Sequence, residues 1–179
     1  PTRESASENI YMRPEAAAAL EALFAGAAED GLTLYATSGY RSYSTQKAIF
    51  ERKLDRMSEK QANLSVAKPG YSEHQTGLAM DIEGETTKGT GLTEAFGESP
   101  EGIWAAKHCA EYGFIIRYPK DKTKITGYIY EPWHLRYVGR EAAQEITALD
   151  VTFEEYIAMV RSDRIQWLQE ETQYDDQNP

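Results

Sequence analysis

The sequence predicts an α+β fold, with helices packed around a small, largely antiparallel sheet. Stretches with helical periodicity alternate with stretches of strand periodicity along the chain, and no internal repeat is seen. Two of the strand-like stretches carry apolar residues at every second position, as strands with one buried face do. The chain has 179 residues, of which 41% are hydrophobic, and this is enough for one core.

The first part of the chain is predicted to form two helices and one strand. An alanine-rich helix begins at Pro14, because proline is tolerated in a first helical turn, and ends before Gly31. Residues 33–38 alternate as a strand. An amphipathic helix is expected over residues 44–58, followed by a polar loop over residues 59–71.

The next part is predicted to be a bend that enters a second strand. Gly77 permits the bend, and the residues after it alternate in polarity. Asp81 therefore shares one pleat face with Ala79 and Glu83. Residues 83–97 contain four glycines and four threonines, which predicts a surface loop.

The last part is predicted to contain three helices, two strands and an exposed loop. Thr152 and Glu155 have the spacing of a capping box at the start of the final helix. Residues 1–169 are expected to form one domain, and the acidic tail 170–179 is expected to lack fixed structure. The other elements are a helix at 99–113, a strand at 114–116, the loop at 118–126, a strand at 133–138 and a helix at 139–149.

Two short segments hold the residues that suggest chemistry. The first supplies His74 and Asp81, and about fifty residues later the second supplies Glu131 and His134. Two imidazoles and a carboxylate suit a catalytic zinc site, which needs three protein ligands and an open position for water. The chain has one cysteine, so a closed cysteine site is excluded. The spare carboxylate of Glu131 can then take a proton from the attacking water.

The spacing of these residues predicts strands rather than one helix. Six residues separate His74 from Asp81, which is too many for adjacent helical turns and suits a loop that enters a strand. Pro132 disfavours a helical conformation at the residue before it, and residues 133–138 alternate as a strand. Two strands of one sheet can therefore present both segments to a shared point on one sheet face.

The third histidine is interpreted differently. A single histidine is more often a hydrogen-bonded structural residue than a metal ligand, and His108 lies within a helical pattern. We expect it to be structural. Cys109 beside it is expected to be a small packed apolar side chain.

The chain resembles a known family in three segments. The family is that of the D-alanyl-D-alanine carboxypeptidases of the VanY type, which belong with the lysostaphin and hedgehog zinc domains. The resemblance as a whole covers roughly residues 10–160. The motifs that carry it are Ser72-x-His74-x2-Gly77-x-Ala79-x-Asp81, Glu131-Pro132-Trp133-His134, and Ser38-Gly39-Tyr40-Arg41-Ser42-x3-Gln46, which looks like the family's substrate-binding stretch.

The resemblance implies a metal site and a mechanism. One zinc ion per chain would be bound by His74, Asp81 and His134. Glu131 would serve as general base and then as general acid. Arg41 would meet the substrate.

The chemistry of arginine supports the last of these roles. A carboxypeptidase must recognise a terminal carboxylate or steady an oxyanion, and the guanidinium of Arg41 can donate two parallel hydrogen bonds to either. Gln46 and Ser72 are candidates for neutral contacts with the substrate, although Gln46 also fits a solvated helix residue and Ser72 a turn. Ser38 and Trp133 complete the expected substrate-binding set.

Three classes of function follow from these residues. The first is a zinc carboxypeptidase that removes terminal D-Ala from peptidoglycan stem peptides, by D,D- or L,D-cleavage. The second is a zinc endopeptidase of wall crosslinks, which Arg41 disfavours because such an enzyme meets no free carboxylate beside the scissile bond. The third is a zinc-dependent binding module without turnover, which has no need for Glu131. The first class is the one we expect.

Composition limits the partners. A formal net charge of −10 and a pI near 4.8 argue against nucleic acid and against anionic membrane surfaces. No apolar stretch approaches the ~20 residues of a membrane span. The chain opens at Pro1 without a Met or an export signal, so a mature fragment is expected. Because the expected substrate, peptidoglycan, lies outside the cytoplasmic membrane, we expect the protein to be located there, in the bacterial cell envelope. We also expect it to be a monomer.

Overall fold

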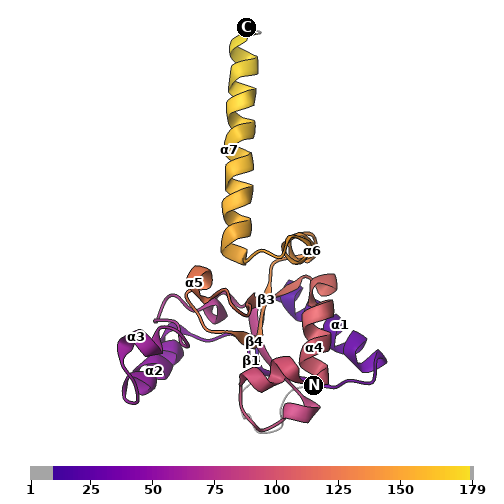
Figure 1. Cartoon of the computed structure of the whole chain (residues 1–179), viewed down its shortest axis with the longest axis vertical. Coiled ribbons are helices and arrows are strands. Elements are labelled where there is room, and N and C mark those ends of the chain that lie inside the picture. Colours follow the sequence, from indigo (N-terminus) through magenta and orange to yellow (C-terminus); the bar gives the residue numbers. More distant parts are fainter. Residues whose placement is uncertain (1–9, 178–179) are drawn as a thin grey trace.

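A four-stranded antiparallel sheet in the order β1-β2-β4-β3 lies at the centre of the molecule (Figure 1). The computed structural model describes residues 10–177, with side chains up to residue 166. The α+β fold predicted from the sequence is therefore confirmed. The strands are β1 (Leu34–Ser38), β2 (Ala79–Gly84), β3 (Phe114–Tyr118) and β4 (Glu131–Tyr137).

Helices of very different lengths surround this sheet. The α-helices are α1 (Pro14–Glu29), α2 (Tyr43–Leu54), α3 (Glu59–Ala62), α4 (Pro100–His108), α5 (Thr123–Thr126), α6 (Arg140–Leu149) and α7 (Phe153–Gln177). The 3-10 helices are η1 (Glu73–Thr76), η2 (Glu85–Thr87), η3 (Glu94–Glu98) and η4 (Cys109–Tyr112).

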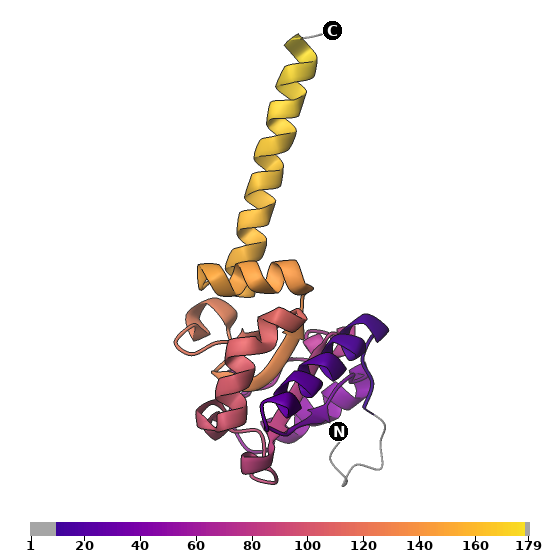
Figure 2. The same cartoon turned by 90° about the vertical axis from the view of Figure 1, so that its right-hand side faces the viewer.

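The main core lies between one face of the sheet and the helices α1 and α4. Met80 and Ile82 of β2 and Leu135 of β4 are fully buried in it. In the views of Figures 1 and 2, α1 and α4 lie side by side on this face, where α1 contacts β1 and α4 contacts β2 and β4. Since side chains alternate along a strand, the intervening Asp81 and His134 are directed to the opposite face. Burial of each large apolar side chain contributes about 1.5–3 kcal/mol to holding that arrangement.

The expected helix over residues 44–58 ends earlier than predicted. Helix α2 ends at Leu54, and a separate short helix, α3, begins after Ser58. The Ser58 hydroxyl accepts a hydrogen bond from the backbone N–H of Gln61, and the Gln61 side chain accepts one from the backbone of Ser58. This capping box starts a new helix inside the segment that was expected to be a loop.

Short helices also interrupt the two other segments predicted as loops. Helix η2 lies within residues 83–97, η3 begins there and ends at Glu98, and α5 lies within residues 118–126. Helix α5 ends at Thr126 and is followed by Gly127, which has a φ of 79° that favours glycine. The predicted strand at 114–116 extends to Tyr118, because β3 continues its pairing with β4 past an irregularity after Ile116.

Helix α7 projects away from the rest of the molecule (Figures 1 and 2). The predicted capping box at its start is confirmed: Thr152 N–H donates to Glu155, and Glu155 N–H donates to the Thr152 hydroxyl. The helix continues through residues 170–177, which the sequence predicted to lack structure, because turns that have already formed add further residues at little cost. Residues 178 and 179 lie outside the described residues.

Among residues 10–177, no helix combines the length and the apolar composition that crossing a membrane would demand.

Candidate metal centre and cleft

His74, Asp81 and His134 come together on the open face of the sheet. One nitrogen from each histidine and one carboxylate oxygen all lie within 4.8 Å of one another. The three residues are almost fully buried, with exposed fractions of 3%, 2% and 4%. Asp81 and His134 are paired directly across β2 and β4, and η1 brings His74 to them. The chain therefore presents two imidazoles and a carboxylate at one point, as the sequence predicted.

A hydrogen bond to the backbone fixes the orientation of the His74 ring. Its Nδ1–H donates to the carbonyl oxygen of Gly39 over 2.8 Å. Nε2 then carries the lone pair, accepts a hydrogen bond from Arg41 over 3.0 Å, and lies 3.3 Å from an Asp81 oxygen. Burial lowers the pKa of His74, which favours the neutral ring. This is the form in which an imidazole can bind a metal through Nε2.

His134 directs Nδ1 toward the cluster, whereas His74 directs Nε2 toward it. Its Nδ1 lies 2.9 Å from Asp81 Oδ1, so that it donates to the carboxylate. Burial acts to lower the pKa of His134, but the hydrogen bond to Asp81 and the carboxylate of Glu73 raise this pKa to about 9. Burial acts to raise the pKa of Asp81, but the charges and hydrogen bonds of both histidines hold it well below its usual range. A metal bound at Nδ1 would displace the proton there, so binding would release a proton.

The donor set fits zinc. Zinc accepts imidazole nitrogen and carboxylate oxygen, and a catalytic zinc site has three protein ligands with a further position for water. The cluster contains three such side chains, and the single cysteine of the sequence, Cys109, lies buried in the main core instead. The three residues thus match an open site rather than a closed structural one.

Glu131 lies at the start of β4 and lines the same cavity. Its side chain is buried, and burial together with the negative charge of Asp81 raises its pKa to about 7, although the positive charge of His134 opposes this shift. A carboxyl group whose pKa is near the working pH can both accept and donate a proton. Glu131 therefore has the environment of an acid-base group.

Arg41 lies at the edge of the cluster, with each part of its guanidinium held by a different residue. Nε donates to the Ser38 hydroxyl over 3.0 Å, and Nη1 lies 3.4 Å from the Gln46 side-chain oxygen. Nη2 donates to Asp81 Oδ2 over 2.7 Å. Nη2 also contacts Nε2 of His74, so a ligand bound at the three-residue cluster would lie close to the guanidinium.

Gln46 is buried and helps to orient Arg41. Only 1% of its surface is exposed, which rules out the solvated helix residue that the sequence also allowed. Its Nε2 donates to the backbone oxygen of Ala67 over 2.7 Å, so its oxygen is directed toward Arg41. Ser38 supports the same side chain from β1. Both residues line the cavity while holding Arg41 in place.

The cleft is a cavity of about 390 Å³. All nine residues that the sequence predicted for the site line it, including Ser72 and Trp133. The sequence did not single out several further lining residues, among them Glu73, although it stands within the first motif. The other such residues are Ile49, Lys53, Ser65, Val66, Ala67, Leu92, Tyr118, Tyr128 and Ile129.

His108 lies away from the cluster, as predicted. Its Nδ1 is 2.7 Å from a Glu111 oxygen, and its ring stacks on Trp104. Cys109 is buried, and burial raises the pKa of its thiol to about 12, so the thiol is inert. Neither residue is among those that line the cleft.

The sequence of the chain is similar to those of known carboxypeptidases. The sequence profile of the VanY family, described as D-alanyl-D-alanine carboxypeptidase, matches residues 9–140. YodJ of Bacillus subtilis (strain 168), a protein classed provisionally as a carboxypeptidase, is 51% identical over 158 residues, which are 88% of this chain. The matched region is 58% of that relative's length, and the chain spans about half the length of two further relatives, the D-alanyl-D-alanine carboxypeptidases of Enterococcus faecium and Enterococcus faecalis.

Two solved structures are similar to the fold described above. The LD-carboxypeptidase LdcB has 50% sequence identity and a TM-score of 0.80, with 88% of this chain and 74% of that chain covered. A variant of the vancomycin-resistance D,D-pentapeptidase VanY, solved in complex with Zn(II), has 36% identity and a TM-score of 0.71. In that comparison 88% of this chain and 90% of that chain are covered.

Proposed function

Because this chain belongs to the VanY family of D-alanyl-D-alanine carboxypeptidases, we propose that it is itself a zinc-dependent carboxypeptidase. Its substrate would be the stem peptide of peptidoglycan, from which it removes a terminal D-alanine. One observation carries this proposal: the buried cluster of His74, Asp81 and His134 shares one cavity with Glu131 and Arg41.

The proposed metal ligands are His74 through Nε2, Asp81 through its carboxylate and His134 through Nδ1. These are the atoms that converge at the cluster. The related VanY structure that contains Zn(II) supports the choice of metal. Zinc held there would act as a Lewis acid that activates a water molecule and polarises the scissile carbonyl.

Glu131 is the proposed acid-base group. Its carboxylate accepts a proton from the attacking water and returns that proton to the amine of the leaving D-alanine. The pKa of about 7 leaves the group partly ionised at neutral pH, and a cation bound at the cluster would lower this pKa by its charge. Glu131 would then be ionised at the start of the reaction, as a general base must be.

Arg41 is proposed to bind the substrate. Ser38, Gln46 and Asp81 hold its guanidinium in a fixed orientation beside the cluster. A guanidinium held in this way can donate hydrogen bonds to the terminal carboxylate of the peptide or to the oxyanion that forms at its carbonyl. Ser72 and Trp133 line the cavity and are proposed as further contacts with the peptide.

L,D-cleavage is the form of the reaction that we expect. The sequence identity to the LD-carboxypeptidase LdcB is 50%, whereas it is 36% to the D,D-pentapeptidase VanY. An L,D-carboxypeptidase releases D-alanine from a tetrapeptide stem, and a D,D-carboxypeptidase releases it from a pentapeptide stem. We expect the first substrate to be preferred.

Peptidoglycan as substrate implies an extracytoplasmic location in the bacterial cell envelope. The cluster, Glu131 and Arg41 all come from one chain, so a monomer is expected to be competent.

Purified tetrapeptide and pentapeptide stems provide the test. Each would be incubated with zinc-loaded protein, and the products would be identified by mass. We expect D-alanine and a tripeptide from the tetrapeptide. Release of D-alanine from the pentapeptide alone would contradict L,D-cleavage, and release from neither stem would contradict carboxypeptidase activity. Muropeptide binding without any release would then support a binding module instead.

A further inference from the structure

Glu73 stands next to the proposed ligand His74 in the sequence, but its side chain lies beside the other histidine, His134. Its two carboxylate oxygens have different surroundings. Oε1 accepts a hydrogen bond from Arg117 Nε over 2.8 Å and forms an ion pair with Arg136 Nη1 at 2.9 Å. Oε2 lies 3.7 Å from His134 Nε2. Glu73 thus connects two arginines to one imidazole.

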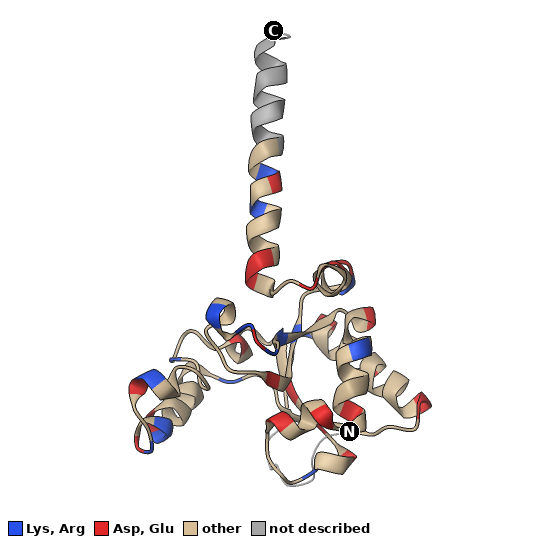
Figure 3. Ribbon diagram, viewed as in Figure 1, with Lys and Arg blue, Asp and Glu red and all other residues tan. Residues whose placement is uncertain are grey.

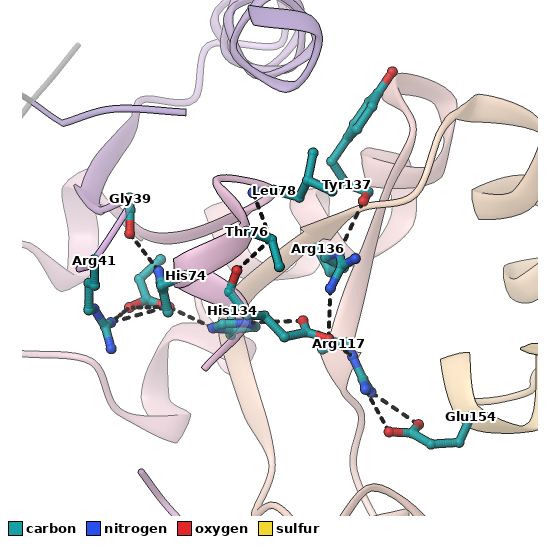
Figure 4. A network of polar contacts seen from close by, with 12 residues as sticks. Gly39, Arg41, His74, Thr76, Leu78, Arg117, His134, Arg136, Tyr137 and Glu154 are labelled. Atoms are coloured by element: carbon teal, nitrogen blue, oxygen red, sulfur yellow. Dashed lines mark hydrogen bonds and ion pairs between the residues drawn. The ribbon is translucent and has the colours of Figure 1, made fainter. Parts of the chain in front are cut away.

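The two arginines leave Glu73 little freedom. Arg117 extends from β3 and Arg136 from β4, and the two neighbouring strands place both side chains around the same oxygen. Arg117 also forms a two-pronged pair with Glu154, with nitrogen–oxygen distances of 3.0 and 2.6 Å. Figure 4 follows these contacts from His134 to Arg117 and Glu154.

The outer end of this network lies in α7. Glu154 belongs to the first turn of that helix, which is coloured red at its base in Figure 3. The base of the projecting helix is therefore tied, through Arg117 and Glu73, to the metal cluster. The network joins η1, β3, β4 and α7.

The His134 ring faces a carboxylate on each side. Nδ1 faces Asp81 and is the proposed ligand atom. Nε2 is buried, and it has no hydrogen-bond partner within the described part of the chain. Oε2 of Glu73 is likewise buried without a hydrogen-bond partner among those residues. These two atoms face each other, and a small movement of either side chain would join them.

We propose that Glu73 is a positioning residue: it holds the hydrogen of His134 on Nε2, so that Nδ1 presents its lone pair to the metal. This inference rests on the proposed function. A carboxylate that accepts from the outer nitrogen of a metal-binding histidine fixes both the tautomer and the orientation of the ring. Arg117 and Arg136 hold Oε1, so Oε2 remains directed toward the ring.

Replacing Glu73 by glutamine reverses this arrangement with almost no change of size. If the amide oxygen of Glu73→Gln stays with the two arginines, its NH2 group faces His134 Nε2. That nitrogen must then accept a hydrogen bond, which moves the ring hydrogen to Nδ1, the ligand atom. If the amide turns over, its NH2 group faces two guanidinium groups, which can only donate.

Zinc affinity, measured by competition with a chromogenic chelator on the full chain, is the first readout. We expect the zinc dissociation constant of Glu73→Gln to rise roughly 10- to 100-fold, the usual effect of removing such a partner. The matched control is Glu101→Gln. Glu101 is also a shielded carboxylate, with 2% of its surface exposed, and it accepts from the backbone and hydroxyl of Thr86, outside the metal cluster. Glu101→Gln should therefore lower thermal stability without changing zinc affinity.

The second readout is the tautomer of His134 in the zinc-loaded parental protein, taken from nitrogen-15 NMR of its ring. We expect the hydrogen on Nε2, and this measurement decides the matter even if Glu73→Gln fails to fold. A hydrogen on Nδ1, or a zinc affinity of Glu73→Gln within about twofold of the parental value, overturns the positioning role. A parental protein that binds no zinc overturns the proposed function and this inference with it.

Discussion

Asp81 of β2 and His134 of β4 lie directly opposite each other in the antiparallel sheet, with His134 Nδ1 2.9 Å from Asp81 Oδ1. Their neighbours Met80 and Leu135 point to the other face and are buried in the core. The packing of the core thus fixes the register that brings the two side chains together. A slip of one residue would turn either side chain away from the site.

Removal of a ligand should abolish zinc binding. The parental protein is expected to bind about one zinc per chain, because His74, Asp81 and His134 form one three-ligand site. His134→Ala should lose most of that zinc in elemental analysis of protein purified without chelator. His108→Ala is the matched control and should keep it, since His108 pairs with Glu111 elsewhere. Unchanged zinc content in both His74→Ala and His134→Ala would refute the ligand assignment.

Lysine should not replace Arg41. The guanidinium donates in three directions, to Ser38, to Gln46 and to Asp81, and a single ammonium group cannot reproduce this arrangement. We expect Arg41→Lys to lower kcat/KM for D-alanine release by roughly 10²-fold or more, nearly as much as Arg41→Ala.

Arg52→Lys provides the control for that experiment. Arg52 is exposed on α2, and among the described residues its guanidinium donates only to a backbone oxygen of the same helix, so its replacement should leave kcat/KM unchanged. Near-normal activity of Arg41→Lys would show that the shape of the guanidinium is not required.

Loss of the Glu131 carboxylate should separate catalysis from metal binding. Glu131→Gln removes the proton acceptor but none of the three proposed ligands, so zinc content should stay at the parental level. Turnover should fall by at least ~10²-fold, the usual lower range for a positioned acid-base group. D-alanine release, zinc content and thermal stability would be measured on one preparation. Parental turnover by this variant would contradict the proposed mechanism.

Glu131 should also destabilise the zinc-free protein at neutral and alkaline pH. Burial raises its pKa from an ordinary 4.5 to about 7, so between these values the folded state binds more protons than the unfolded state. Stability due to this group therefore decreases as pH rises from 4.5 to 7. Above pH 7, we expect Glu131→Gln to be more stable than the parental protein by up to about 3 kcal/mol.

Urea unfolding of the parental protein and of Glu131→Gln, measured at several pH values with a metal chelator present, tests this prediction. The two free energies of unfolding should converge below pH 4.5, where Glu131 is protonated in both states. A difference that does not change with pH would show that burial does not perturb this carboxyl group.

The sequence by itself determined the fold class and the motifs that supply nine of the residues lining the cleft. Helix α1 begins and ends at its proline and glycine signals, and Thr152 and Glu155 form the predicted cap, because such signals act within one turn of chain. All nine predicted residues line the cavity, since they stand in three short motifs whose resemblance to the VanY family can be recognised before the fold is known.

Tertiary structure decided which atoms of those residues meet. Gln46 looked equally suited to solvent, and only its burial against Ala67 directs it toward Arg41. Glu73 carried no local signal, because its partners Arg117 and Arg136 are more than forty residues away and reach it through the pairing of β3 with β4. The order of the strands and their register set these contacts, and both depend on packing between distant parts of the chain, which local periodicity does not encode.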